Sequence, residues 1–216
     1  MIFMKVRPYS ESQVNNLMDK MGDAFDYAIN DCKIAGAEFV KIFVASMVCK
    51  KIENGDVSCI SGKSGIEIAI ECVNEITGKE LNIATRERYE HTDEYWCGWA
   101  ICYYQWWSSR KYADIFRVVS FDEMLCMYPT LHETSKEKFA EVLDEKMRKA
   151  YPETNLKRIR TAYGCSQREL AEMSGVGLRS IQMYEQRNKD INKAHAESLY
   201  CLSKSLGCNM EDLLEN

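Results

Sequence analysis

Helix breakers are scarce in this chain of 216 residues, which has only three prolines and eleven glycines. Bulky apolar residues are plentiful, with eleven methionines, twelve tyrosines and four tryptophans. An apolar share of 46% and a charged share of 28% are ordinary for globular proteins, so a disordered or fibrous chain is excluded. This composition favours helices over short strands, and we expect an all-α protein.

No Cys-x-x-Cys pair occurs among the ten cysteines, which are scattered singly and do not fit a disulfide framework. A metal site at His91, Cys97 and Cys102 is a conceivable alternative. However, Cys97 and Cys102 are five residues apart and would point about 140° apart on a helix. We therefore expect packing thiols, no metal site and no other cofactor.

Long hydrophobic runs are also missing. The longest, Phe39 to Val48, is interrupted by Lys41 and falls far short of the roughly 20 residues that span a membrane. Residues 1–9 lack the apolar stretch of a secretory signal. Together with the unpaired cysteines, these features predict a cytoplasmic protein that does not contact a membrane.

The formal net charge of −5 excludes a chain that is basic throughout. Residues 1–152 carry 24 acidic against 19 basic side chains, whereas residues 157–193 carry eight basic against four acidic ones, a net charge of +4. Binding to phosphates requires such a local excess of positive charge. Any nucleic-acid surface is therefore expected within residues 157–193.

Apolar residues recur at helical spacing through the first two thirds of the chain. We expect one helix over Phe39 to Val48 and another between the start signal Ser64 and the stop signal Gly78. Two more helices are expected over residues 121–128, ended by Pro129, and over residues 135–150, capped by Thr134.

A helix is expected after Thr92, and it is apolar nearly all round. Such helices are normally buried, so we place it at the centre of the first domain. Its aromatic stripe is interpreted as core, and the alternative is a ligand pocket or a partner surface. The stripe consists of Trp96, Trp99, Tyr103, Trp106 and Trp107.

Tyr151-Pro152-Glu153 interrupts the helical pattern, and no tryptophan or phenylalanine follows position 152. We therefore expect a helical domain over residues 1–151 and a second domain over residues 153–216. The second domain is expected to contain five short helices, at residues 156–163, 167–173, 178–186, 193–206 and 210–214.

The second and third of these helices meet the steric requirements of a helix-turn-helix. Leu170 and Met173 are expected to face inward, and small Ala171 lets the two helices approach closely. Gly175 supplies the positive φ of the turn between them. The residues that fill the core from the third helix are Ile181 and Tyr184.

The run "SQRELAEMSGVGLRSIQMYEQRNKDIN" resembles the Cro/C1-type (XRE) helix-turn-helix regulators, over about residues 155–214. The resemblance implies a five-helix, lambda-repressor-like domain that binds double-stranded DNA, with residues 178–186 in the major groove. The two-fold symmetry of such operators further predicts a homodimer.

Individual site residues follow from the resemblance. The positions that match base or groove contacts are Leu178, Arg179, Gln182 and Met183. Those that match phosphate contacts are Gln167, Gly177, Ser180, Arg187 and Lys189. Arg160 and Glu185 match a pair that forms an internal salt bridge in relatives. Where the family often has Ser or Thr, Gly177 removes a side-chain cap and one phosphate contact.

Signs of enzymatic chemistry are weak. Gly62-Lys63-Ser64 lacks the earlier glycine of a phosphate-binding P-loop, because Val57 stands at that position. His132 and His195 have no acid or nucleophile in a recognisable arrangement. We therefore expect a protein that is not an enzyme.

The first domain resembles the amino-terminal regions of uncharacterised bacterial regulators from toxin–antitoxin-like operons. Two functions stay open. In one, the protein is a transcriptional repressor whose first domain senses a small ligand or dimerises. In the other, it is an antitoxin whose first domain neutralises a cognate partner protein, while the second domain represses the shared operon.

Overall fold

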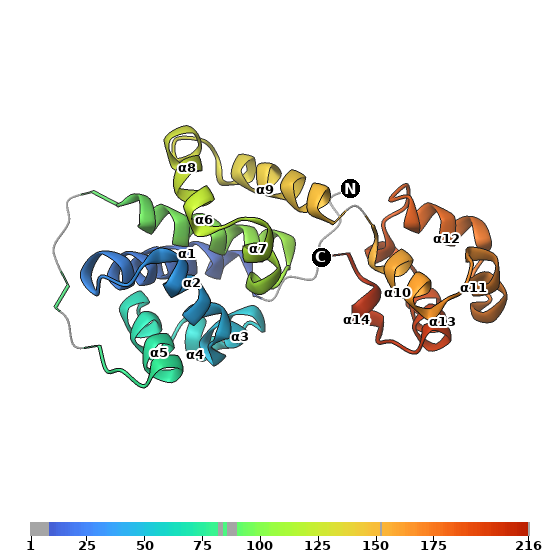
Figure 1. Cartoon of the computed structure of the whole chain (residues 1–216), viewed down its shortest axis with the longest axis horizontal. Helices are drawn as coiled ribbons and strands as arrows, with labels where there is room; N and C mark the ends of the chain where they lie inside the picture. The colour runs from blue at the N-terminus through green and yellow to red at the C-terminus, as the bar shows by residue number, and fades with distance from the viewer. Residues whose placement is uncertain (1–8, 82–83, 86–89, 152, 216) are drawn as a thin grey trace. The chain divides into compact units, whose positions relative to one another are not determined.

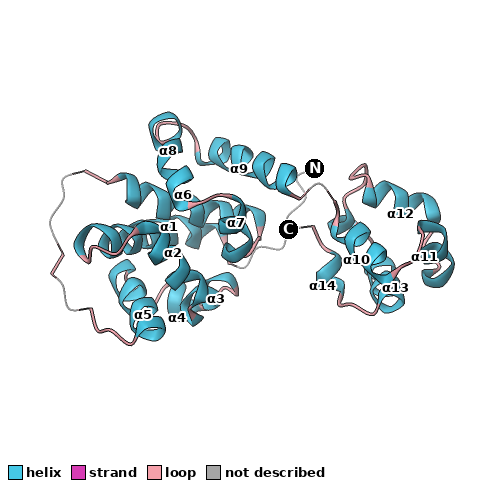
Figure 2. Ribbon diagram, in the orientation of Figure 1, coloured by secondary structure: helices cyan, strands magenta, loops and turns pink. Residues whose placement is uncertain are grey.

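The computed structural model describes residues 9–81, 84–85, 90–151 and 153–215. It divides into two compact units, Met1–Met147 and Arg148–Asn216. The described residues form helices, turns and loops and contain no strand (Figures 1 and 2), which confirms the expected all-α class. Among them, no helix has both the length and the apolar character needed to cross a membrane. The expected interruption at Pro152 lies outside the described residues.

The first unit is built around α1 and α6, which run against each other along their length (Figure 1). α5 packs on α1 and α2, and α8 packs on α6 and α2. The elements of this unit are α1 (Glu11–Asp26), the π-helix η1 (Tyr27–Asp31), α2 (Gly36–Ala45), α3 (Met47–Glu53), α4 (Val57–Ile60), α5 (Gly65–Thr77), α6 (Asp93–Ser108), α7 (Tyr112–Val118), α8 (Phe121–Leu131) and α9 (Lys136–Ala150), whose last turn extends beyond the boundary at Met147.

α6 is buried nearly all round, as its apolar surface predicts. It starts at Thr92, whose side chain accepts a hydrogen bond from the backbone N–H of Tyr95. Gly98 lets α6 approach α1, since a Cβ at this position would overlap the carbonyl oxygen of Met21. The lack of a side chain at Gly98 therefore permits a close contact between the two central helices.

Most of the aromatic stripe belongs to the core. Trp96 packs edge-on against Tyr128 and Phe139, with ring centroids 5.6 and 5.3 Å apart. Trp106 donates a hydrogen bond of 2.9 Å to the carbonyl oxygen of Tyr9. Trp96, Tyr103 and Trp106 are thus buried and form no open ligand or partner surface, whereas Trp99 and Trp107 are half-buried.

The ends of α5 confirm the sequence prediction. Ser64 and Glu67 form the expected capping box, and Gly78 ends the helix in the left-handed conformation, with φ of 69°. The expected single helix over Phe39 to Val48 is wrong, because the chain breaks into α2 and α3 at Ser46. Its hydroxyl accepts from the N–H of Cys49 at 3.1 Å and donates to the carbonyl of Phe43 at 2.7 Å, so it ends one helix and caps the next.

Two further boundaries differ from the sequence prediction. Pro129 lies inside α8, which continues to Leu131, so the expected end at this proline is wrong. α9 is capped by Ser135, whose hydroxyl accepts from the N–H of Lys138 at 3.2 Å. The Thr134 hydroxyl instead donates to the carbonyl of Leu131, at 2.8 Å, and is therefore not the cap of α9.

All ten cysteines are free thiols. Burial raises the pKa of both Cys72 and Cys102 to about 12, which disfavours their thiolates. Cys126, in contrast, is exposed. No cluster of three or more His, Cys, Asp or Glu side chains in the described part of the chain is arranged to hold a metal ion.

The second unit consists of short helices around its own small core (Figure 1). Its elements are α10 (Asn155–Tyr163), α11 (Gln167–Ser174), α12 (Leu178–Glu185), the 3₁₀ turn η2 (Ile191–Lys193), α13 (Ala196–Leu206) and α14 (Met210–Leu213). The helix expected from residue 193 begins only at Ala196, because Asp190 caps a separate 3₁₀ turn and Ala194 is extended. The fully buried core residues include Leu156, Leu170, Ile181, Leu202 and Leu213.

Candidate nucleic-acid interface

The turn between α11 and α12 is fixed by local hydrogen bonds. The backbone N–H of Ser166 donates to the Glu169 carboxylate at 2.7 Å and forms half of a capping box that starts α11. Gly175 ends α11 with φ of 70° and donates to the carbonyl of Ala171 at 2.9 Å. The Ser174 hydroxyl donates to the carbonyl of Leu170 at 2.6 Å and accepts from the N–H of Val176 at 3.2 Å.

Both helices of the motif are anchored in the core from one side. Leu170, Ile181 and Tyr184 are buried, and Ala171 packs half-buried against them. The expected inward position of Met173 is wrong, since this side chain is 47% exposed. Ser174, four residues after Leu170, takes the inward position instead because residues four apart share one face of a helix.

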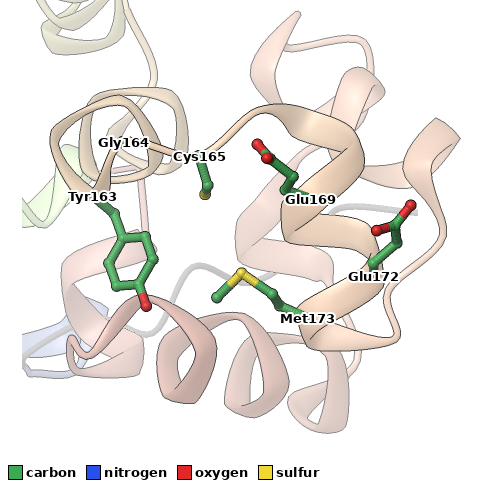
Figure 3. Close-up of a pocket in the computed structure, with 6 residues that line it drawn as sticks. All are labelled: Tyr163, Gly164, Cys165, Glu169, Glu172 and Met173. Carbon is green, nitrogen blue, oxygen red and sulfur yellow. The ribbon is translucent and has the colours of Figure 1, made fainter.

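Met173 lines a pocket at the ends of α10 and α11, where its side chain extends toward Tyr163 (Figure 3). The pocket is lined by Tyr163, Gly164, Cys165, Glu169, Glu172 and Met173. These residues include two carboxylates and no basic side chain. The pocket therefore does not suit a phosphate group.

An ion pair joins α10 to the end of α12. The Arg160 guanidinium donates through Nε and Nη2 to the two carboxylate oxygens of Glu185, at 2.6 and 2.9 Å. Its Nη1 donates to the carbonyl of Cys165 at 2.7 Å. The hydrogen bond with Glu185 is the main cause that raises the pKa of Arg160. The pair implied by the family resemblance is thus present in the structure.

Gln167 is part of the same network. Its side-chain Nε2 donates to the Glu185 carboxylate at 2.7 Å, so three elements meet at one acidic group. This hydrogen bond fixes the orientation of the Gln167 amide at the start of α11. The role of this residue as a phosphate contact stays a prediction.

The side of α12 opposite the core is open. Arg179 is exposed, and its guanidinium makes no hydrogen bond or ion pair with any residue that the structure describes. Leu178, Ser180, Gln182 and Met183 are half-buried. Because Ile181 and Tyr184 hold the opposite side in the core, α12 presents Arg179 outward.

Gly177 precedes α12 and provides no side-chain cap, as its identity predicts. Its φ is −55°, and a Cβ added at this position would meet no atom within 4 Å. Any L-residue therefore fits at this position without strain.

Two basic residues follow α12 in the connection to η2. The ammonium group of Lys189 lies 5.2 Å from the centroid of the Tyr184 ring. The Arg187 guanidinium lies 3.1 Å from the carboxylate of Glu215, a residue that the sequence prediction did not include. Glu215 is 28 residues away and belongs to no motif, so no pattern in the sequence indicates this contact.

A helix-turn-helix domain is defined by two short helices joined through a three-residue turn, a left-handed glycine in that turn and an outward basic residue on the second helix. Residues 156–213 match the family model described as helix-turn-helix, which confirms the Cro/C1-type resemblance of this segment. The match makes this segment similar to the helix-turn-helix domains of DNA-binding transcription regulators. Comparisons with curated proteins and with solved structures gave no significant match.

Proposed function

We propose that this protein represses transcription by binding a specific sequence of double-stranded DNA through its second unit. The observation that carries the proposal is the position of α12, which is anchored by Ile181 and Tyr184 and leaves Arg179 outward. The major groove of B-form DNA admits one α-helix, and side chains on its outer face reach the base edges.

Each residue of the proposed interface has a role that matches its chemistry. Arg179 donates two hydrogen bonds to a guanine edge, a contact worth about 1–3 kcal/mol of discrimination. The residues that contact neighbouring bases or the major groove next to Arg179 are Leu178, Gln182 and Met183. The proposed phosphate contacts are Gln167, Gly177, Ser180, Arg187 and Lys189, which position the helix without reading the sequence.

The experiment that tests this role compares Arg179→Ala with Lys189→Ala. Bound fragments are first selected from random DNA with the full chain, and affinities are then measured for the selected and a scrambled sequence. Arg179→Ala should lower the preference for the selected sequence, whereas Lys189→Ala should weaken binding to both sequences alike.

Arg117→Ala is the matched control, because Arg117 is a surface arginine of α7 in the first unit. It removes one positive charge and should leave both affinities unchanged. An equal loss on both sequences for Arg179→Ala and Lys189→Ala would contradict the proposed roles. The absence of any binding at low salt would overturn the function itself.

The proposal includes a homodimer, because two-fold operators are bound by two copies of a helix-turn-helix domain. Size-exclusion chromatography of the free protein and of its DNA complex tests this point. A monomer in both measurements would contradict it.

A second candidate is an antitoxin whose first unit masks a partner protein. It is favoured by an apolar pocket between α8 and α9, to which Met127, Leu131 and Val142 contribute. Co-expression with the products of neighbouring genes, followed by size-exclusion chromatography, tests this candidate. A stable complex would support it, and a protein that stays solitary would count against it.

A further inference from the structure

Arg187 has an unusual backbone conformation for an arginine. It directly follows Gln186, the C-cap of α12, and its φ is 56°. Residues with a Cβ avoid this left-handed region, and glycine is its usual occupant. The side chain of Arg187 makes several polar contacts within the second unit.

The guanidinium of Arg187 contacts oxygen atoms of Tyr151, Glu153 and Glu215 among the described residues. Its Nη2 lies 3.1 Å from the carbonyl oxygen of Tyr151 and 3.3 Å from that of Glu153. It also lies 3.1 Å from a carboxylate oxygen of Glu215. Because the Arg187 and Glu215 side chains are 35% and 24% exposed, the ion pair is within reach of solvent and of ions.

Contacts with residues other than Arg187 also hold Glu215 in place. Its second carboxylate oxygen accepts a hydrogen bond of 2.5 Å from the backbone N–H of Asn155. The backbone N–H of Glu215 donates to Oδ1 of Asn192 at 2.8 Å, and the side-chain amide of Asn192 donates to the backbone carbonyl oxygen of Glu215. The carboxylate is therefore positioned at Arg187 by the fold of the second unit and not by the ion pair alone.

A carboxylate and a DNA phosphate use the same guanidinium donors. In the proposed function Arg187 faces a phosphate together with Lys189, two residues further along. We propose that Glu215 competes with the DNA phosphate for Arg187 and thereby sets the affinity of the protein for DNA. This inference rests on the proposed function and assigns an affinity-determining role to a residue outside the helix-turn-helix motif.

The test uses the full chain with Glu215→Gln. Glutamine keeps a side-chain oxygen for the Asn155 N–H but removes the charge that competes with phosphate. Glu211→Gln is the matched control, because Glu211 is an exposed acid of α14 and the change in net charge is the same. Affinity for the selected DNA is measured over a series of salt concentrations.

Glu215→Gln should bind several-fold more tightly than Glu211→Gln. Its plot of log affinity against log salt should also be steeper, by at most about 0.9, the value for one full phosphate contact, because Glu215 competes for this contact in the wild type. In the double variant Arg187→Gln/Glu215→Gln both gains should vanish. Equal affinities and slopes for Glu215→Gln and Glu211→Gln would overturn the proposal.

Thermal melts separate this effect from a loss of structure. If Glu215→Gln unfolds at a clearly lower temperature than the wild type, Glu215→Asp serves as the second variant. The shorter aspartate side chain moves the negative charge away from Arg187. This variant should give a smaller gain in the same direction, and an unchanged affinity would again overturn the proposal. A wild-type protein that binds no DNA would instead show that the proposed function has failed, and this inference with it.

Discussion

The Arg160 guanidinium and the Glu185 carboxylate form a two-point ion pair, with N–O distances of 2.6 and 2.9 Å, and their side chains are only 12% and 2% exposed. The pair connects the first helix of the second unit to the end of α12. Because water reaches neither group freely, each charge depends on the other for its compensation.

Removal of one partner should therefore destabilise the second unit strongly. For Arg160→Met we expect a loss of about 3–5 kcal/mol in the free energy of unfolding, because Glu185 would stay buried without its countercharge. Glu185→Gln should cost less, since the amide oxygen still accepts from Arg160 or Gln167. Chemical denaturation followed by far-UV circular dichroism measures both values, and equal, small losses would contradict the expectation.

The two glycines that flank the turn should respond oppositely to serine. Gly177→Ser supplies the missing cap of α12 at a backbone position that any L-residue adopts, and we expect a gain of about 0.5–1 kcal/mol. Gly175→Ser is the matched control, because its φ of 70° penalises a Cβ by about 1–2 kcal/mol. Thermal melts of the second unit report the sign of both changes, and a loss of stability in Gly177→Ser would disprove the first expectation.

A second pair of glycines tests the packing of α1 against α6. Gly98→Ala should destabilise the first unit by about 1–3 kcal/mol, because the added methyl group would overlap the backbone of Met21. For Gly22→Ala, the three atoms nearest to the added methyl group all belong to the ring of Tyr95, a side chain that can move aside. Its gain in helix propensity, about 1 kcal/mol, should largely offset the adjustment. Urea denaturation compares the two variants, and similar stabilities would contradict this interpretation.

The thiols should differ widely in reactivity. Cys126 is exposed and should be alkylated first at mildly alkaline pH. Cys72 and Cys102 should react only after unfolding, because burial raises the pKa of both to about 12 and blocks access to them. Peptide mass spectrometry after timed alkylation identifies the modified residues. Cys126→Ser should remove the fast phase, and early labelling of Cys102 would argue against the buried core described above.

Much of the fold follows from the sequence because many helix ends are specified locally. Ser64 with Glu67 and Gly78 define α5 within a few residues, and Ser166 and Gly175 do the same for α11. These caps depend on hydrogen bonds between residues close together in the chain. The residue types at those positions therefore predict them.

The boundaries that the sequence did not predict depend on less regular local choices. Ser46 lies within the apolar run from Phe39 to Val48, and nothing in that pattern indicates that its hydroxyl ends α2 and caps α3. Pro129 normally stops a helix, yet α8 passes through it to Leu131. The spacing of apolar residues alone does not show whether a helix ends or continues at such a residue.

The candidate site likewise combines features that the sequence predicts with features that it does not. The steric core of the motif, with Gly175, Ile181 and Tyr184, is readable from spacing alone. The contact between Arg187 and Glu215 is not readable, because it joins two charged surface residues through the folded chain. The exposed position of Met173 is not readable either, because a short helix with few apolar residues leaves the direction of its inner face open.

The chain's four tryptophans, at positions 96, 99, 106 and 107, all lie in α6. Indole emission excited at long wavelength therefore reports on the first unit, while the second unit contributes none of it. Melting of the central helix can thus be followed by fluorescence in the full chain, separately from the unfolding of the second unit.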